Sequence, residues 1–383
     1  MYTTNRLFEG RQSGGTKRFT ELYYGLRRLG IDVDLYCGDA PEVLVAKNIE
    51  AYALKSLKRS QSLFIPTELK NYFSNIKNIR KIKKKAYNKV IVFDVPTAIS
   101  LSISRVRHIQ LFIRQNLLEY RMISLQERTN SQLVRIFYGW LLKVSESICL
   151  ISAEHIIIQC MYDYDALLKR HKIIKHIIVK KTTIQINNVN PSWIVEMSKA
   201  DSPLWSEEML SSYSDKLLIG YVGNFGDERK GHRIFVEAIR VLIDDGLRIN
   251  AVLVGDGKLL EVYKAECKDY QSISFLGRLD NPLPVMRACD LIVVPSMADS
   301  CPNTVMEALY NETPVIGTKS GGIPEILNDE MALFENNANS LAEKIVELSH
   351  KGNLLKLKEK QKTRKAELTF EWSEKIYQHL GLS

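Results

Sequence analysis

Five short apolar runs, separated by stretches with helical periodicity, occupy residues 217–317 of the 383-residue chain. Each run is short enough to be a buried parallel strand, and the stretches between them place apolar residues on one helical face. Strand–helix repetition of this kind builds a doubly wound parallel sheet. The expected strands are Leu217–Val222, Ala251–Val254, Ile273–Leu276, Leu291–Val294 and Pro314–Gly317, and the expected helices are Ile234–Ile243, Leu259–Cys267, Leu283–Cys289 and Thr304–Tyr310.

The first half of the chain alternates in the same way. One apolar helical face ends at Gly30, and Ile31, Val33 and Leu35 then alternate as a strand would. The fold class is therefore α/β, with two Rossmann-like doubly wound domains expected to face each other across a cleft. The helical face comprises Phe19, Leu22, Tyr23, Leu26 and Leu29, and the further expected strands are Val90–Phe93, Ile109–Ile113, Ile156–Ile158 and Thr183–Ile186.

Composition sets the expected domain boundaries. Residues 191–216, which are rich in serine, are expected to link a first domain, 1–190, to a second domain, 217–362. A terminal helix within 363–383 is expected to pack back on the first domain. Met1–Arg11 supplies only a poor apolar strand, so either the first strand is short or the start of this sequence is internal to the gene.

Charge is divided unevenly. Residues 1–180 carry 30 Lys+Arg and 15 Asp+Glu, whereas the remainder carries 23 and 29. The basic run Arg80–Lys85 is either a solvated face or a contact for anionic lipid, a phosphorylated substrate or nucleic acid. No nucleic-acid-binding module accompanies it, so a nucleic-acid partner is not expected.

Six cysteines are scattered without a CxxC pair, which predicts buried free thiols in a reducing compartment. No run of eighteen or more apolar residues occurs. We therefore expect a cytoplasmic protein whose membrane contact, if any, is peripheral at the inner face of the cell membrane.

Three loops at the expected carboxyl ends of strands are candidate ligand sites. In Gly223–Gly231, the N-terminus of the next helix can hold a phosphate, and Arg229 and Lys230 would add charged hydrogen bonds. Gly255–Gly257 lies at the same edge. Both loops are equally compatible with ordinary turns.

The third loop, Pro295–Leu309, places two acids eight residues apart. Asp299 lies in the loop and Glu307 lies a turn into the helix, for which Asn303 is the expected N-cap. Such a pair can hold a polyhydroxylated ligand at two points while the helix N-terminus faces a phosphate.

The motifs Pro-Ser, acid, Pro-Asn-Thr-Val and Glu-Ala in this loop, followed by Thr-Pro-Val-Ile-Gly-Thr and Gly-Gly-Ile-Pro-Glu, resemble the donor half of the family 4 retaining glycosyltransferases, which have the GT-B fold. The resemblance covers most of residues 217–350. It extends weakly to the first domain through Ser13-Gly14-Gly15-Thr16, whose loop faces the cleft in that family.

The resemblance implies roles for individual residues. Lys230 would hold the donor diphosphate, and Arg229 would replace an arginine that the family often has at Asn224. Glu307 would bind the donor ribose and Asp299 would lie by the sugar, so that Lys230, Asp299 and Glu307 form the catalytic set. The expected donor-binding residues are Gly14, Gly15, Gly223, Asn224, Arg229, Lys230, Gly255, Asp256, Gly257, Ser300, Cys301, Pro302, Asn303, Thr304 and Glu307.

The resemblance implies a nucleotide-diphosphate sugar as co-substrate, with no metal and no other cofactor. The string Asp32-Val33-Asp34 is interpreted as solvent-facing rather than metal-binding. Many relatives have a histidine near the anomeric carbon, but the comparable strand here ends in Arg114, Gln115 and Asn116, and the last two are expected to line the site. His108 is expected at the entrance of that strand, and His171 and His176 are expected at the surface.

The expected function is retaining transfer of a hexose-type sugar to a glycan or a polyprenyl-diphosphate-linked acceptor, in cell-surface polysaccharide or lipopolysaccharide synthesis. Two alternatives are a non-catalytic nucleotide-sugar-binding partner of another transferase and a sugar-nucleotide epimerase of the same fold. The epimerase would require general-base carboxylates or a histidine in the cleft.

Overall fold

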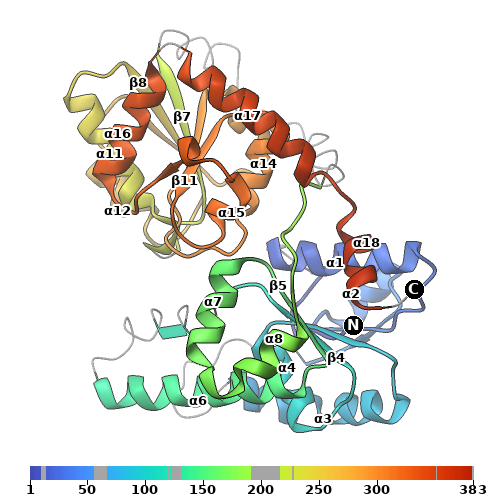
Figure 1. Ribbon diagram of the computed structural model, residues 1–383. Coiled ribbons are helices and arrows are strands. Elements are labelled where there is room, and N and C mark those ends of the chain that lie inside the picture. The colour runs from blue at the N-terminus through green and yellow to red at the C-terminus, as the bar shows by residue number, and fades with distance from the viewer. Residues whose placement is uncertain are drawn as a thin grey trace. The chain divides into compact units, whose positions relative to one another are not determined.

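The computed structural model describes residues 1–9, 14–55, 67–116, 118, 121–122, 131–190, 216–226, 228–350 and 352–381. The chain forms two compact units (Figure 1). The first comprises Met1–Ile186 and Trp372–Ser383, and the second comprises Asn187–Glu371. The second unit thus begins at Asn187, whereas the predicted linker 191–216 lies outside the described residues except for its last position.

The second unit is built on a parallel sheet whose described strands lie in the order β12-β11-β10-β7-β8-β9. The chain runs outward from β7 through β8 to β9, then returns to place β10 on the other side of β7. The strand order therefore reverses between β7 and β10. The bounds are β7 Leu217–Val222, β8 Ile249–Val254, β9 Ile273–Gly277, β10 Leu291–Val294, β11 Val315–Thr318 and β12 Leu333–Phe334.

Helices connect these strands as the apolar periodicity predicts. Ile234, Phe235, Ile239 and Leu242 give α11 a buried face against the sheet. The helix after β10 begins at Asn303, one residue earlier than predicted, and Pro302 instead of Asn303 occupies the N-cap position. The helices are α11 His232–Asp244, α12 Leu260–Glu266, α13 Leu283–Ala288, α14 Asn303–Asn311, α15 Ile323–Leu327, α16 Ala338–Ser349 and α17 Asn353–Leu368, with short 3₁₀ turns η2 Glu228–Lys230 and η3 Glu330–Ala332.

The first unit also has parallel strands, in two groups ordered β1-β2 and β3-β4-β5-β6. Tyr2 joins the groups through isolated parallel bridges to Tyr36 and Val92. Ile31 and Val33 precede β1 instead of belonging to it, which corrects the predicted strand. The bounds are β1 Leu35–Cys37, β2 Ala51–Ala53, β3 Val90–Phe93, β4 Ile109–Ile113, β5 His155–Ile158 and β6 Thr182–Ile184.

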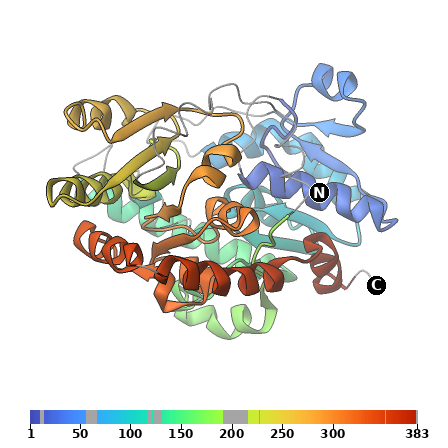
Figure 2. The same ribbon diagram turned by 90° about the horizontal axis from the view of Figure 1, so that it is seen from above.

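Two helical layers cover this sheet. α3 packs on α4, α4 on α6 and α6 on α8, which gives one layer, and α1 packs on α18 in the other (Figures 1 and 2). Gly25 permits the second contact, because a Cβ there would lie 2.2 Å from the Ser373 Cβ. The helices are α1 Gly14–Arg28, α2 Pro41–Ala46, α3 Thr67–Lys85, α4 Val95–Ile103, α6 Gln132–Ser152, α7 Met161–Arg170, α8 Lys175–Lys181 and α18 Trp372–His379, with the 3₁₀ turn η1 Lys172–Ile174.

The C-terminal segment is divided between the units. α17 belongs to the second unit, so the boundary falls after it and not at residue 363. α18 belongs to the first unit, where Trp372 is 2% exposed and packs against the Phe112 ring. All six cysteines are buried and free, as predicted. Within the described ranges, every helix is too short or too polar to cross a bilayer.

Candidate functional site

The carboxyl ends of β7 and β10 mark the site in the second unit. Ligands of open α/β sheets bind where the strand order reverses, outside the carboxyl ends of the strands. The loops that follow these two strands, residues 223–231 and 295–302, are two of the three loops predicted from sequence. The reversal between β7 and β10 therefore brings them to one edge of the sheet.

The two loops are held in direct contact. The Met297 N–H donates to the Arg229 carbonyl at 2.8 Å. Gly231 has φ 70°, and a Cβ there would lie 1.8 Å from the Pro295 carbonyl oxygen. A side chain at position 231 would therefore push the loops apart. Asp227, within the same predicted motif, lies outside the described residues.

Lys230 and Asp299 meet across this contact. The Lys230 ammonium donates to an Asp299 carboxylate oxygen, and the side chains are 37% and 20% exposed. An ion pair this accessible to water is worth about 1 kcal/mol or less. A diphosphate can therefore displace Asp299 from Lys230 at small cost. The structure thus brings together two of the three residues of the predicted catalytic set.

The start of α14 lies beside the same edge. The Thr304 hydroxyl donates to the Val222 carbonyl at 3.3 Å, which ties the first turn of α14 to the end of β7. Pro302 gives this helix no side-chain cap, so its first N–H groups are suited to an anion. Glu307, the third residue of the predicted set, is half-buried in the second turn.

The side chains of four other predicted donor-binding residues are either buried or bonded within their own loop. Ser300, Cys301 and Pro302 are buried, so any contact they make with a ligand is through the backbone. Asn224 is exposed, and its side chain accepts from the Gly226 N–H at 2.5 Å within its own loop. The orientation of Asn224 gives no indication of a role toward a phosphate.

The loop Gly255-Asp256-Gly257 supports the β7 loop through its backbone. The Phe225 N–H donates to the Asp256 carbonyl at 2.8 Å, and a Cβ at Gly255 would lie 1.8 Å from the Gly223 carbonyl oxygen. These contacts place Gly223 and Phe225 but add no charged group to the site.

Sequence reasoning did not assign a structural role to Gly321 and Gly322. The Gly322 N–H donates to the Asp299 carbonyl at 2.9 Å, and a Cβ at Gly321 would lie 2.3 Å from that carbonyl oxygen. The turn after β11 therefore fixes the backbone of Asp299. The only indication in the sequence is the Gly-Gly motif itself.

In the first unit, Gly14 and Gly15 open α1 beside the end of β4. A Cβ at Gly15 would lie 1.7 Å from an Arg114 guanidinium nitrogen, so a side chain at position 15 would displace the end of the Arg114 side chain. Arg114 donates to Asp94, which follows β3, at 2.6 Å. An ion pair at adjacent strand ends thus occupies the position where the resemblance led us to look for a histidine.

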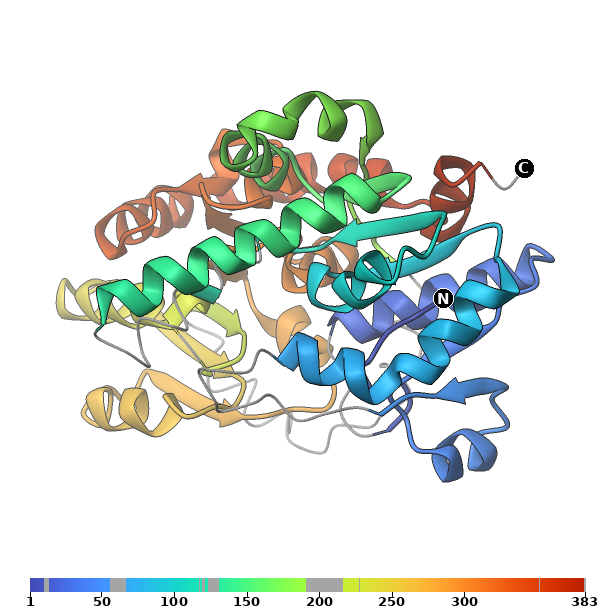
Figure 3. The same ribbon diagram turned by 90° about the horizontal axis from the view of Figure 1, so that it is seen from below.

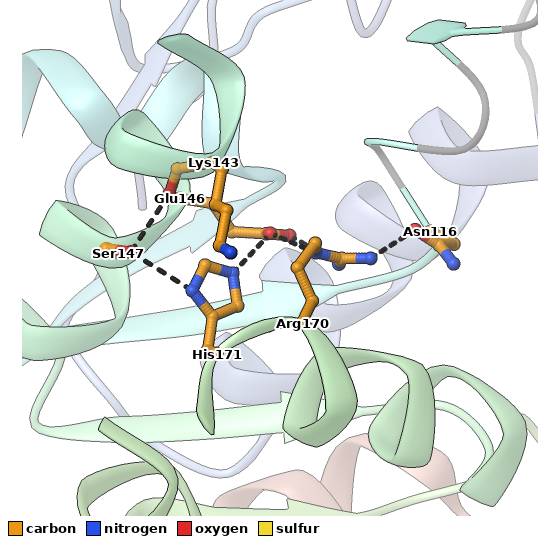
Figure 4. Close-up of polar contacts among 6 residues, drawn as sticks. All are labelled: Asn116, Lys143, Glu146, Ser147, Arg170 and His171. Carbon is orange, nitrogen blue, oxygen red and sulfur yellow. Dashed lines mark hydrogen bonds and ion pairs between the residues drawn. The ribbon is translucent and has the colours of Figure 1, made fainter. Parts of the chain in front are cut away.

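The surface prediction for His171 is wrong (Figure 4). His171 is 3% exposed, and its Nε2 lies 2.7 Å from a Glu146 carboxylate oxygen. Its Nδ1 lies 3.0 Å from the Ser147 hydroxyl. Arg170 donates to both Glu146 oxygens, at 2.7 and 3.0 Å, and to the Asn116 side-chain oxygen at 3.0 Å. The C-terminal end of α7 and the second half of α6 thus share one network of polar and charged side chains.

Glu146 is held in its charged form in this network. Burial alone would raise the pKa of Glu146, but the hydrogen bond from His171 and the charge of Arg170 outweigh burial and lower that pKa. Asn116, predicted to line the site, supports Arg170, and Gln115 is exposed.

The remaining polar residues singled out in the sequence are exposed or make other contacts. His176 is exposed, as predicted, and His108, before β4, lies 2.6 Å from Glu154. Asp32 is exposed, but Asp34 accepts from Lys85 at 2.7 Å and is not fully solvent-facing. The described residues contain no group of three or more His, Cys, Asp or Glu side chains arranged to hold a metal.

A known family matches this chain over the second unit, and individual relatives match part of its length. The family described as glycosyl transferases, group 1, matches residues 216–351. An uncharacterized glycosyltransferase of Methanocaldococcus jannaschii is 33% identical over 39% of this chain and 43% of that protein. N-acetyl-alpha-D-glucosaminyl L-malate synthase of Bacillus anthracis is 31% identical over 34% of each. The chain thus matches less than half the length of these relatives.

Solved structures match nearly the whole chain in fold. Sucrose-phosphate synthase of Thermosynechococcus elongatus has a TM-score of 0.69 at 18% identity, covering 96% of this chain and 92% of that one. The Anabaena protein HepE in complex with UDP-glucose has a TM-score of 0.68 at 15% identity, covering 98% of each. The predicted GT-B fold class, with two Rossmann-like units, is confirmed.

Proposed function

We propose that the chain transfers a hexose-type sugar from a nucleotide-diphosphate sugar to a glycan or lipid-linked glycan, with retention at the anomeric carbon, because residues 216–351 match the family of group 1 glycosyl transferases. The observation that carries the proposal is the Lys230–Asp299 pair where the strand order reverses between β7 and β10, beside the uncapped N-terminus of α14. A polyprenyl-diphosphate-linked acceptor, in surface polysaccharide or lipopolysaccharide synthesis, would place the chain at the inner face of the cell membrane.

In the proposed reaction, the donor diphosphate takes the place of Asp299 on Lys230. The bond from the anomeric carbon to the diphosphate oxygen breaks, and the acceptor oxygen bonds to that carbon on the same face. The acceptor proton passes to the departing diphosphate. Lys230 and the first N–H groups of α14 stabilise the negative charge that develops on the leaving group, and Glu307 holds the ribose hydroxyls.

The proposal is tested by incubating the chain with UDP-, GDP- and ADP-sugars and measuring free nucleotide. UDP-glucose comes first, since HepE binds it. Slow release of nucleotide supports a transferase. Tight donor binding without release supports instead the non-catalytic partner, which the Arg114–Asp94 pair at the usual histidine position favours. Absence of both binding and release contradicts the proposal.

Replacing Glu307 with alanine should loosen donor binding about 10- to 150-fold, because a hydrogen bond to a charged acceptor is worth about 1.5–3 kcal/mol. Titration calorimetry with the turned-over donor measures this loss. Glu343→Ala, an exposed change on α16, is the matched control and should bind as the unaltered chain does. Equal affinity in Glu307→Ala would remove Glu307 from the site.

Removal of divalent metal should leave turnover unchanged. The cationic groups already named would neutralise the leaving diphosphate without a metal ion. The rate of nucleotide release is measured after dialysis against EDTA and again after adding Mg²⁺ or Mn²⁺. A rate that falls after dialysis and returns with either ion would show that the site needs a metal.

A further inference from the structure

One helical layer of the first unit carries both cationic and apolar side chains at exposed positions. It is made by α3, α4, α6 and α8, which pack in that order (Figure 3). Residues 71–85 and 171–181, together with α4 and α6, contain twelve lysines and arginines but a single acid, Glu146. Glu146 is buried and bound by Arg170, so it contributes no exposed negative charge to this layer.

The first turns of α6 carry an exposed apolar stripe. Leu133, Ile136, Phe137 and Trp140 are 80%, 60%, 63% and 58% exposed, at the spacing of one helical face. The next exposed residue along the stripe is Lys143. A helix that served only the core would bury such a face, whereas large aromatic side chains beside cationic ones are typical of helices that lie in a membrane interface.

The last turns of α3 carry an exposed cationic stripe in the same layer. Lys77, Arg80 and Lys84 follow the exposed ring of Phe73 at helical spacing. Within the described part of the chain, none of these three makes an ion pair, in contrast to Lys85, which pairs with Asp34. Their charge is therefore directed to solvent rather than neutralised by the fold.

We propose that the stripe Leu133–Trp140 and the stripe Lys77–Lys84 dock the chain on an anionic lipid bilayer. The apolar side chains of α6 enter the headgroup region, and the cations of α3 lie against lipid phosphates. Charge complementarity selects lipid, because residues 71–85 and 171–181, with α4 and α6, offer a large anionic surface many cations and no exposed acid. The further acid of α3, Glu68, lies in its first turn, away from the cationic stripe in its last turns. The inference rests on the membrane-linked acceptor of the proposed function. The docking surface lies in the first unit, and its test does not depend on turnover of the donor.

The test is co-sedimentation of the full chain with phosphatidylcholine vesicles, with and without about 30% phosphatidylglycerol. Binding is expected only to the anionic vesicles and to weaken in high salt. The triple variant K77Q/R80Q/K84Q should lower the partition coefficient about a hundredfold, since each cation near the surface contributes about fivefold. Trp140→Ser should lower it about tenfold.

Matched controls remove equal charge and an equal apolar group elsewhere. R248Q/K268Q/K356Q, on exposed sites of the second unit, and Val45→Ser, on α2 in the first unit, should bind vesicles as the unaltered chain does. Thermal unfolding should be the same for all variants, because every changed side chain is exposed. Donor hydrolysis should also stay unchanged, which separates failure of docking from failure of the donor site.

Three outcomes would overturn the proposal. The first is equal binding to neutral and anionic vesicles, or an equal loss in the control triple. The second is tighter binding to duplex DNA than to anionic vesicles, which would assign the cationic stripe to nucleic acid. The third is a dimer without lipid that Trp140→Ser dissociates, which would assign the apolar stripe to a second copy of the chain.

Discussion

Replacing Lys230 with alanine is expected to lower kcat about 100- to 1000-fold, the usual effect of removing one preorganised group that stabilises charge in a transition state. Lys230 directly precedes the Gly231 turn, which packs against the Pro295 carbonyl and thereby holds the β7 and β10 loops together. The loss should fall on kcat more than on donor affinity, because the diphosphate gains negative charge as it leaves. Steady-state release of nucleotide, with KM and kcat determined separately, measures both.

Two variants separate the cation from its partner. Lys230→Arg keeps the charge and should retain more activity than Lys230→Ala, although the bulkier guanidinium does not replace an ammonium exactly. Adding Asp299→Asn to Lys230→Ala removes the unpaired carboxylate and should restore donor affinity more than kcat. Lys268→Ala, on an exposed site of the same unit, should match the unaltered chain. A Lys230→Ala enzyme with unchanged kcat would contradict the assigned role.

Replacing Glu146 with alanine is expected to lower the free energy of unfolding of the first unit by about 3–5 kcal/mol, because it leaves the Arg170 and His171 side chains buried without their carboxylate. Urea unfolding followed by circular dichroism measures the loss. Glu50→Ala, at an exposed site of the same unit, should change stability by about 0.5 kcal/mol or less. An equal effect of the two changes would show that the buried network contributes nothing to the fold.

The contribution of Glu146 to the free energy of unfolding should also depend on pH. Its pKa is lowered in the folded chain, so its stabilising effect is fully present above the ordinary carboxylate pKa of about 4.3. The effect is lost as the pH falls through the lowered folded value. The difference in the free energy of unfolding between the unaltered chain and Glu146→Ala should therefore be constant at neutral pH and shrink in acid. A difference that grows in acid would contradict a lowered pKa of Glu146 in the folded chain.

The strands were predictable where apolar runs are continuous and buried on both faces. β3, β4, β7 and β10 begin and end at the predicted residues. The error at Ile31 and Val33 has a physical cause in the neighbouring strands. β2 begins to pair at Ala51 opposite Leu35, and Tyr2 bridges Tyr36, so among the described residues the ladder on β1 begins at Leu35.

The donor loops were predictable because they follow strands and contain glycines, acids and cations in a specific order. Their mutual contact was not, since it depends on the strand order that places β10 beside β7. His171 was misplaced because nothing near it in sequence indicates burial. Its partner Glu146 lies on another helix, and only the packing of α6 against the segment after α7 brings the two together.

We propose that the β7 and β10 loops bind a donor diphosphate through Lys230, and that Glu307 on α14 binds the donor ribose. The most direct test is calorimetric titration of the preferred nucleoside diphosphate, and of its sugar conjugate, into the unaltered chain, Lys230→Ala and Glu307→Ala. Glu307→Ala should loosen both ligands by the same factor. Lys230→Ala should loosen the nucleoside diphosphate more than its sugar conjugate, because the free diphosphate carries more negative charge. Equal affinities in all three proteins, or no binding of any nucleoside diphosphate, would contradict the account.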